Sequence, residues 1–327
     1  FNENRAVWQH LMGDDVWRID YQMAPDADPA EVSRESVVRE RLARQFGADC
    51  EVEIVWVGPY AYRSECIDRM RDGPVFFMGD AAKVVSPFGA RGGNTGIADA
   101  DNLAWKLAAV LRQEAPASLL ESYHEERHEA ARENVRVTAR TARFLRPADG
   151  AERVLRSAAI ALARQHPFAR QLINTGRMAI ANPYTASSAC AANGGRPVQN
   201  VALAWADGSA GTLNDLLAWS GSRLLLLAFG PLGAPALARL RSLSRQAPVL
   251  CVQVVERDGS AQATEHVQDA ACRLRAACHL PSIAGGWALL RQDSYLAAAG
   301  DFIDGALVQA VATALGLNRA THAEVTA

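Results

Sequence analysis

One continuous segment, residues 73–108, restricts the fold of this chain more than any other part of its 327 residues. It runs GPVFFMGDAAKVVSPFGARGGNTGIADADNLAWKLA: an apolar run, a Gly-Asp pair, a proline, several glycines and then a helical pattern. In open α/β folds, ligands bind beyond the C-terminal ends of the strands. This order therefore predicts that Gly79 and Asp80 form a ligand-binding turn between a strand and a helix.

The glycines after Pro87 favour the same interpretation. Gly89, Gly92, Gly93 and Gly96 would let backbone N–H groups point at a ligand just before a helix expected over 95–112. The unpaired amides of a helix N-terminus favour negative charge there. The alternative is a glycine-rich turn followed by a capped helix without any ligand, which is what most such segments are.

The segment resembles the second flavin-binding motif of the class A FAD-dependent aromatic hydroxylases, which have the para-hydroxybenzoate hydroxylase fold. It is most similar to the phenol hydroxylase and 3-(3-hydroxyphenyl)propionate hydroxylase branch. Residues 122–145, SYHEERHEAARENVRVTARTARFL, resemble the helix that follows the motif in that branch. The C-terminal part resembles its thioredoxin-like domain in the order of its elements.

The resemblance implies that this segment binds FAD. Asp80 would meet ribityl or ribose hydroxyls, Pro87 would lie against the isoalloxazine, and backbone N–H groups would follow its pyrimidine edge. Asp99 and Asn102 would brace the start of the helix, although DADN is also ordinary helix-start chemistry. The implied cofactor-binding residues are Gly79, Asp80, Pro87, Gly92, Gly93, Asn94 and Thr95.

The implied activity is hydroxylation of a phenolic or related aromatic substrate with NAD(P)H and O2; the sequence does not choose between NADH and NADPH. No catalytic or substrate-binding residue can be assigned, because Trp8, Trp17 and Trp56 could line an aromatic pocket or fill a core. Two alternatives stay open: a flavin-dependent oxidoreductase that does not hydroxylate a ring, and a non-catalytic piece whose thioredoxin-like domain mediates oligomerisation. A homodimer would be compatible with either.

Three departures from the family pattern shape these expectations. Lys83 stands where the family usually has histidine, and we expect it to be solvated or to touch a phosphate. The N-terminal GxGxxG unit is absent, and the chain begins with Phe1 within a folded pattern. We therefore expect a partial FAD/NAD(P)-binding monooxygenase fold in a piece of a longer protein, binding FAD weakly or not at all by itself.

The elements indicate a mixed α/β chain of two domains. Residues 1–181 form the partial substrate- and FAD-binding region, helical over 118–181, and 182–200 are a linker rich in Pro, Ala, Ser, Asn and Gly. Residues 201–327 form a thioredoxin-like α/β domain without CxxC. Its strands are expected at 201–205, 223–229, 249–255 and 287–291, and its helices at 212–219, 233–246, 265–277 and 302–315.

Earlier elements follow from period and turn residues. Strands are expected at 15–23, 51–60 and 75–78, and helices at 33–47, 119–145, 151–164 and 168–180. The charges of the helix over 119–145 suggest a solvated surface.

Composition argues against several classes of protein. The formal charge of −2 disfavours nucleic-acid binding, and no run approaches the roughly 18 apolar residues that span a bilayer. Six cysteines without a CxxC pair indicate reduced thiols in a cytoplasm. His124 and His128 match H-E-x-x-H, but the dense charge around them favours a hydrated helix over zinc, so we expect no metal site.

Overall fold

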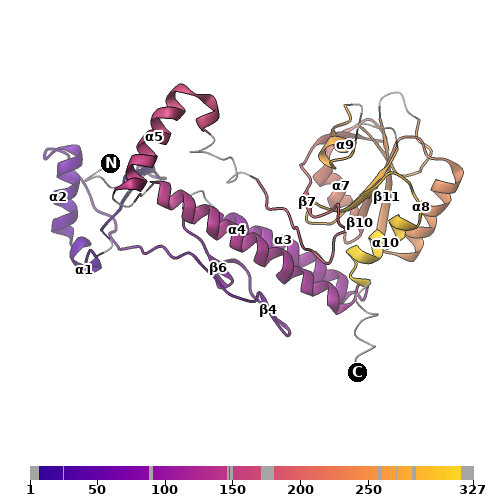
Figure 1. Ribbon diagram of the computed structural model, residues 1–327, viewed down its shortest axis with the longest axis horizontal. Helices are drawn as coiled ribbons and strands as arrows, with labels where there is room; N and C mark the ends of the chain where they lie inside the picture. The colour runs from indigo at the N-terminus through magenta and orange to yellow at the C-terminus, as the bar shows by residue number, and fades with distance from the viewer. Residues whose placement is uncertain are drawn as a thin grey trace. The chain divides into compact units, whose positions relative to one another are not determined.

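The computed structural model describes residues 7–24, 26–87, 91–145, 147, 150–170, 180–256, 260–269, 271–281 and 285–317. Helices and strands are mixed along the chain (Figure 1). The chain divides into two compact units. The first comprises Phe1–Ser64, Val85–Gly89 and Val137–Met178, and the second comprises Glu65–Val84, Ala90–Arg136 and Ala179–Ala327. These units combine segments differently from the predicted ranges 1–181 and 201–327.

The described part of the first unit contains a hairpin, several helices and residues 137–145, which are the last residues of a long helix. Strands β1 (Val7–Leu11) and β2 (Trp17–Tyr21) pair antiparallel, with Gln9 opposite Ile19. The predicted strand over 15–23 contains β2, and the predicted helix over 33–47 contains α2 (Glu35–Phe46). The remaining helices are α1 (Pro29–Val32), α5 (Ala151–Gln165) and the 3-10 turn η3 (Pro167–Ala169). Of the helix expected over 168–180, residues 171–179 lie outside the described residues.

The strand predicted over 51–60 is wrong, because these residues form no strand. An alternating pattern makes a strand only when a neighbouring backbone supplies the ladder hydrogen bonds. Here Val55 and Trp56 are 73% and 77% exposed, and Val52 and Ile54 are only partly buried, so the apolar side chains of the segment are not packed in a core.

The second unit begins with short strand pairs around the Gly-Asp turn. Strand β3 (Glu65–Cys66) pairs with β6 (Lys83–Val84), and β4 (Arg71–Asp72) pairs with β5 (Val75–Phe76). The strand expected over 75–78 is thus only the two residues of β5. The 3-10 turn η1 (Gly79–Ala81) follows.

Two long helices come next. Helix α3 spans Arg91–Leu111, η2 spans Ala117–Leu120 and α4 spans Glu121–Leu145. The helix expected to begin at residue 95 begins four residues earlier, so the glycines at 92 and 93 lie in its first turn instead of a preceding loop. Glycine is a weak helix former, which is why the sequence pattern placed the start too late.

An eight-stranded sheet forms the C-terminal part of the second unit, in the order β7-β14-β13-β10-β11-β12-β8-β9. Its strands are β7 (Arg196–Pro197), β8 (Ala202–Trp205), β9 (Ala210–Thr212), β10 (Leu224–Phe229), β11 (Val249–Val255), β12 (His266–Gln268), β13 (Trp287–Leu290) and β14 (Tyr295–Gly300). Its helices are α7 (Leu213–Ser220), α8 (Ala234–Gln246), α9 (Arg273–Ala277) and α10 (Gly305–Ala314).

The topology follows from pairing and from the two faces of β10. Strands β10 and β11 are parallel across the helix α8, and the hairpin β13–β14 adds antiparallel to β10. Leu224 and Leu226 face a core shared with α8 and α10, whereas Leu225 and Leu227 face a core shared with α7 and α9 (Figure 1). Successive residues of a strand point to opposite faces, so a wholly apolar strand packs helices on both sides.

The prediction of one helix over 265–277 is wrong. Residues 266–268 are strand β12, and only 273–277 are helical. Asp269 separates the two, because its carboxylate accepts the amides of Arg273 at 3.0 Å and Leu274 at 2.7 Å. Such local acceptance of helix-start amides stops one element and starts the next.

Among the described helices, none combines the length and apolarity needed to cross a membrane.

Candidate functional site

The Gly-Asp turn, Gly79 and Asp80, combines a fixed backbone with an exposed side chain. Gly79 has a φ of +57°, a conformation that glycine adopts without steric penalty. Its amide donates to Asp99 Oδ2 at 3.0 Å. Asp80 is exposed, and its carboxylate has no hydrogen-bond partner among the described residues. The turn therefore presents a free carboxylate on a fixed backbone.

The start of α3 lies against this turn. A side chain on Gly96 would place its Cβ 3.4 Å from the Cα of Gly79, so the glycine permits the close approach. Gly93 and Asn94 are exposed, and a Cβ built on Gly93 would meet nothing within 4 Å. Helix α3 is described from Arg91 onward, so Gly92 and Gly93 lie in its first described turn, and the N-terminus of a helix favours negative charge. The open space at Gly93 and the exposed Asp80 carboxylate thus lie in the same unit.

Two buried side chains, Arg91 and Thr95, hold the first turn of α3 in place. Arg91 is buried and donates to Asn134 Oδ1 at 3.0 Å, Asn182 Oδ1 at 3.2 Å and the Ile180 carbonyl at 3.1 Å. Thr95 is also buried, and its hydroxyl donates to the Gly92 carbonyl at 3.1 Å. Thr95 therefore orders the turn that carries the exposed glycine.

Asp99 connects α3, the Gly-Asp turn and α4. Besides the Gly79 amide, its carboxylate accepts from Lys83 Nζ and, at 2.8 Å, from Arg127 Nε. Lys83 is only 3% exposed, so the expectation of a solvated or phosphate-binding lysine is wrong. Burial lowers the pKa of Lys83, although the hydrogen bond to Asp99 opposes that shift.

A larger set of buried ionic side chains continues from Asp99 between α3, α4 and the turn after β13. We call this set the charge cluster; it consists of Lys83, Asp99, Lys106, Glu126, Arg127, Arg291 and Asp293.

Within the charge cluster, Glu126 binds side chains from both α3 and the turn after β13. Its carboxylate accepts from Lys106 Nζ at 2.7 Å, from Asn102 Nδ2 at 2.6 Å and from Arg291 Nη2 at 2.8 Å. Burial alone would raise the pKa of Glu126, but Arg291 and Lys106 outweigh it and hold the pKa well below its usual range. Burial lowers the pKa of Lys106 to about 8. The arrangement keeps a carboxylate ionised with no access to water.

The predicted solvated surface of α4 is therefore wrong for its inner face. Glu126 and Arg127 are 0% and 2% exposed, and Tyr184 Oη accepts from Arg127 Nη1 at 3.1 Å. Polar residues at helical spacing look alike whether water or another protein segment satisfies them. Asp99 and Asn102 were singled out from the sequence, whereas Arg91, Arg127 and Arg291 were not, because their partners are distant in the chain.

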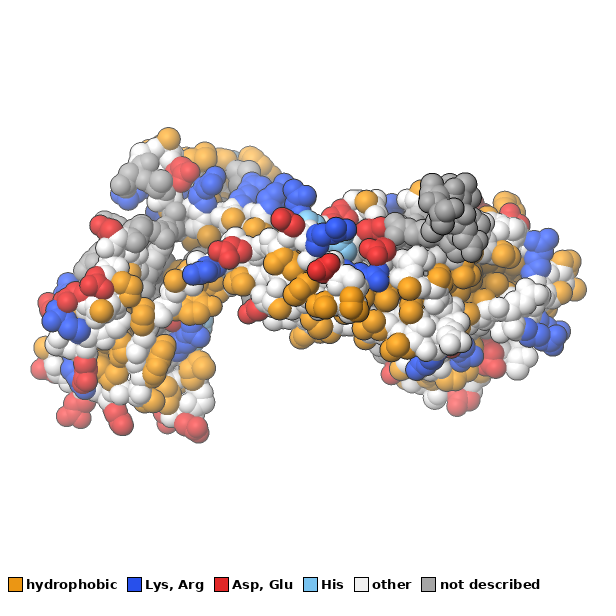
Figure 2. Space-filling view, turned by 90° about the horizontal axis from the view of Figure 1, so that it is seen from below, with side chains coloured by type: hydrophobic (Ala, Val, Ile, Leu, Met, Phe, Trp, Pro, Cys, Tyr) orange, Lys and Arg blue, Asp and Glu red, His pale blue; other side chains and the backbone are white. Residues whose placement is uncertain are grey.

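Other residues predicted or considered for the site belong to the first unit or lie outside the described residues. Pro87 is exposed and belongs to the first unit, and Gly89 lies outside the described residues. Trp17 and Trp56 are exposed in the first unit, and Figure 2 shows apolar side chains at the surface among charged ones. Trp8 is partly buried there.

The histidines of HEERH pack on each other without a metal-like arrangement. Their ring centroids are 4.9 Å apart, and His124 Nδ1 accepts the Met70 amide at 3.2 Å. Burial and His124 lower the pKa of His128. Within the described ranges, no group of three or more His, Cys, Asp or Glu could hold a metal ion.

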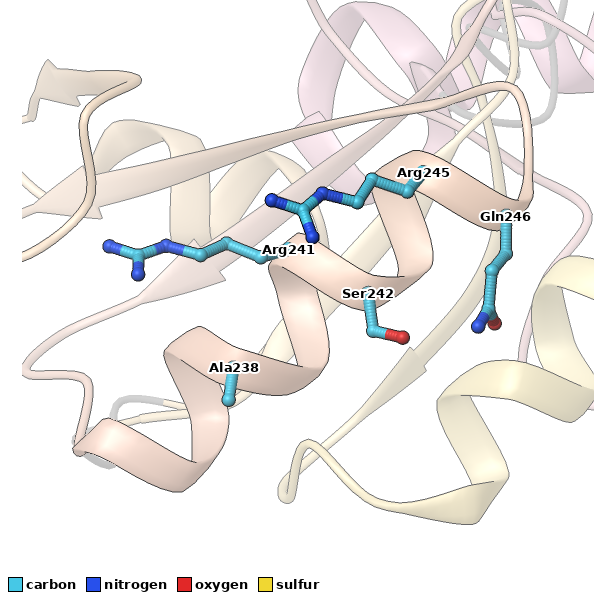
Figure 3. A pocket seen from close by; sticks show the side chains of 5 residues that line it. All are labelled: Ala238, Arg241, Ser242, Arg245 and Gln246. Atoms are coloured by element: carbon cyan, nitrogen blue, oxygen red, sulfur yellow. The ribbon is translucent and has the colours of Figure 1, made fainter.

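A hollow of about 440 Å³ on α8 is separate from this site in the fold. Its lining comes from a single helix, as Figure 3 shows: Ala238, Arg241, Ser242, Arg245 and Gln246. It involves none of the residues around the Gly-Asp turn.

Comparisons with known proteins find similarity to proteins that bind FAD. Residues 4–138 match the family described as the FAD binding domain. The 6-methylpretetramide 4-monooxygenase of Streptomyces rimosus is 32% identical over 286 residues, which are 84% of this chain and 50% of that protein. The dialkyldecalin synthase of Streptomyces rugosporus is 43% identical over 93 residues, which are 28% of this chain and 20% of that protein.

A solved structure shares the fold. The flavin-dependent monooxygenase PieE, in complex with FAD and substrate, superposes with a TM-score of 0.70 over 91% of this chain and 57% of that chain, at 22% identity. The chain thus spans a fifth to a half of these two curated relatives.

Proposed function

We propose that this chain is part of an FAD-dependent monooxygenase that hydroxylates a phenolic or related polyketide-derived aromatic substrate with NAD(P)H and O2. The observation that carries the proposal is the exposed first turn of α3, whose open surface at Gly93 lies in the same unit as the free carboxylate of Asp80. The match of residues 4–138 to the FAD binding domain supports it.

The residues present fit a flavin. Asp80 would accept hydrogen bonds from ribityl or ribose hydroxyls, because its oxygens have no other partner among the described residues. The amides of Gly92 and Gly93 would face the electron-rich edge of the ring, where the helix dipole adds a partial positive charge. Asn94 is exposed beside them, and Thr95 holds the turn through its bond to Gly92. When bound, FAD supplies the redox and oxygen chemistry.

The architecture supports two finer proposals. The β10–α8–β11 unit followed by the β13–β14 hairpin and α10 is the element order of a thioredoxin-like domain, and we assign 201–327 to it. The preceding residues 182–200, predicted as a linker, include β7, which pairs with β14 in the same sheet. Cys278 carries no redox role in the proposal, since burial raises its pKa to about 12 and the thiolate is the reactive form. We place the partial monooxygenase fold in 1–181, in the phenol hydroxylase-like branch.

The test uses the full-length gene product. Its FAD content and affinity are measured by absorbance and titration, and substrate-stimulated NAD(P)H oxidation is measured with phenolic and polycyclic aromatic compounds. Gly93→Val should weaken FAD binding at least tenfold, because it fills the open surface against the ring. Gly305→Val is the matched control, since Gly305 also lies in the first turn of a helix with nothing within 4 Å. Equal FAD affinity in both variants would refute the assignment of the site.

A second candidate keeps the flavin but not ring hydroxylation. It is favoured by the match over 93 residues to a protein named dialkyldecalin synthase. Product mass separates the two: a product heavier by one oxygen supports hydroxylation, whereas conversion without O2 consumption supports the second candidate.

A further inference from the structure

We propose that Arg291, on the turn after β13, is a positioning residue for the Gly79–Asp80 turn and acts through a continuous chain of buried hydrogen bonds. The proposal rests on the proposed function, because that function gives the turn its role in binding the cofactor. It assigns the C-terminal sheet a part in shaping the cofactor site.

The first step joins the C-terminal sheet to the long helices. Arg291 is fully buried, and its Nη2 donates to Glu126 Oε2 at 2.8 Å while its Nε donates to Asp293 Oδ1 at 3.0 Å. Glu126 lies on α4. Arg291 therefore neutralises one carboxylate of its own turn and one carboxylate of a distant helix.

The second step crosses α3. Asn102, which is fully buried on α3, donates to Asp293 Oδ2 at 3.0 Å and to Tyr184 Oη at 3.3 Å. The same Tyr184 oxygen accepts from Arg127 Nη1 at 3.1 Å. Burial raises the pKa of Tyr184 well above its ordinary value, so its hydroxyl stays protonated.

The third step reaches the Gly-Asp turn. Arg127 Nε donates to Asp99 Oδ1 at 2.8 Å, and Asp99 Oδ2 accepts the Gly79 amide at 3.0 Å. Asp99 is the only link to that amide in this chain of contacts, and it is 0% exposed. A change in the direction of Asp99 would therefore free the amide that fixes the turn.

Loss of the Arg291 positive charge should disturb the whole chain of hydrogen bonds. Removing one partner of a buried ionic set leaves an uncompensated charge, and the neighbouring groups rearrange to satisfy it. Loss of Arg291 would leave Glu126 and Asp293 competing for Asn102, and Asn102 would release Tyr184.

The experiment measures hydrogen exchange at the Gly79 amide by NMR in the complete protein without FAD. Arg291→Gln should accelerate exchange at Gly79 at least about tenfold, while exchange at Leu227 in the central strand β10 changes less than about twofold. Asp293→Asn is run in parallel, so the test does not depend on the folding of Arg291→Gln. Arg245→Gln on α8 is the surface control. Equal acceleration at Gly79 and Leu227, or none at Gly79, would overturn the proposal.

A double-mutant cycle identifies the route. In an Asp99→Asn background the last link is already weakened, so Arg291→Gln should change exchange at Gly79 by less than about twofold. A full effect of Arg291→Gln in that background would show that the proposed chain of contacts does not carry it. FAD affinity is measured separately: failure to bind FAD would refute the proposed function and leave the exchange result unaffected.

Discussion

Substitution of Glu126 by glutamine tests the charge cluster most directly. The carboxylate accepts from donors on Asn102, Lys106, Ser187 and Arg291, and Glu126 is 0% exposed. Glutamine keeps the shape but removes the negative charge that compensates two buried cations, and it turns an NH2 group toward donors. Breaking a buried ion pair on one side costs about 3–5 kcal/mol. We expect a loss of that size in the free energy of unfolding of the second unit.

Urea unfolding at neutral pH, followed by tryptophan fluorescence and far-UV circular dichroism, measures this loss. Trp105 is a suitable reporter because the Arg291 guanidinium lies 5.2 Å from its ring centroid. The free energy is taken only where the two signals coincide. Glu121→Gln on the same helix is the control: its pair with Arg71 is 48% exposed on the glutamate side, so it should cost at most about 1 kcal/mol.

The dependence on pH gives a second measurement. Because the pKa of Glu126 is lowered on folding, its contribution is fully present above the unfolded pKa of about 4.3 and is lost as the pH falls toward the folded value. Glu126→Gln should flatten the acid side of the stability curve. If Glu126→Gln and Glu121→Gln lose the same free energy and share one acid profile, the cluster does not depend on this carboxylate.

Three further predictions concern the turn and its surroundings. Asp80→Asn should weaken FAD binding about tenfold in the full-length protein and change stability by less than about 0.5 kcal/mol, since the carboxylate has no partner among the described residues. Asp72→Asn is the control. Equal FAD affinities of the two variants in calorimetric titration would contradict the role of Asp80. Burial lowers the pKa of Lys106 to about 8 from 10.5, so the free energy of unfolding should rise with pH between these values. In urea unfolding, Lys106→Met should remove that gain of about 3 kcal/mol. An unchanged dependence of the free energy of unfolding on pH in Lys106→Met would contradict this prediction. Gly96→Leu should cost about 1–3 kcal/mol by crowding Gly79, whereas Gly96→Ala fits at 3.4 Å; equal melting temperatures for the two would show that the helix and turn are not closely packed.

The elements most visible in the sequence were those with a strong local pattern. The predicted helices over 119–145, 212–219 and 233–246 correspond to α4, α7 and α8, and the apolar strands at 223–229 and 249–255 correspond to β10 and β11. Strand β14 escaped prediction because its sequence YLAAAG is rich in alanine, which has little strand preference. Its position depends on pairing with β13, which local sequence does not encode.

The candidate site also contains residues that the sequence predicts and residues that it does not. Gly79, Asp80 and the glycines of α3 were predictable because they lie together in one segment with a recognisable order. The buried contacts of Arg91 and Arg127 were not, since they join residues 28 to 91 positions apart. A buried arginine and a solvated one give the same letter at the same helical spacing, and only the tertiary structure shows which acceptors reach it.

The position of the charge cluster limits how this protein can be recombined with its relatives. Glu126 lies on a helix near the middle of the chain, while Arg291 and Asp293 lie more than 160 residues later. Any hybrid whose junction falls between them would inherit Glu126 and Lys106 from one parent and Arg291 and Asp293 from the other. Such hybrids should be recovered as soluble protein only when both parents carry matching charges at these positions, whatever their overall similarity.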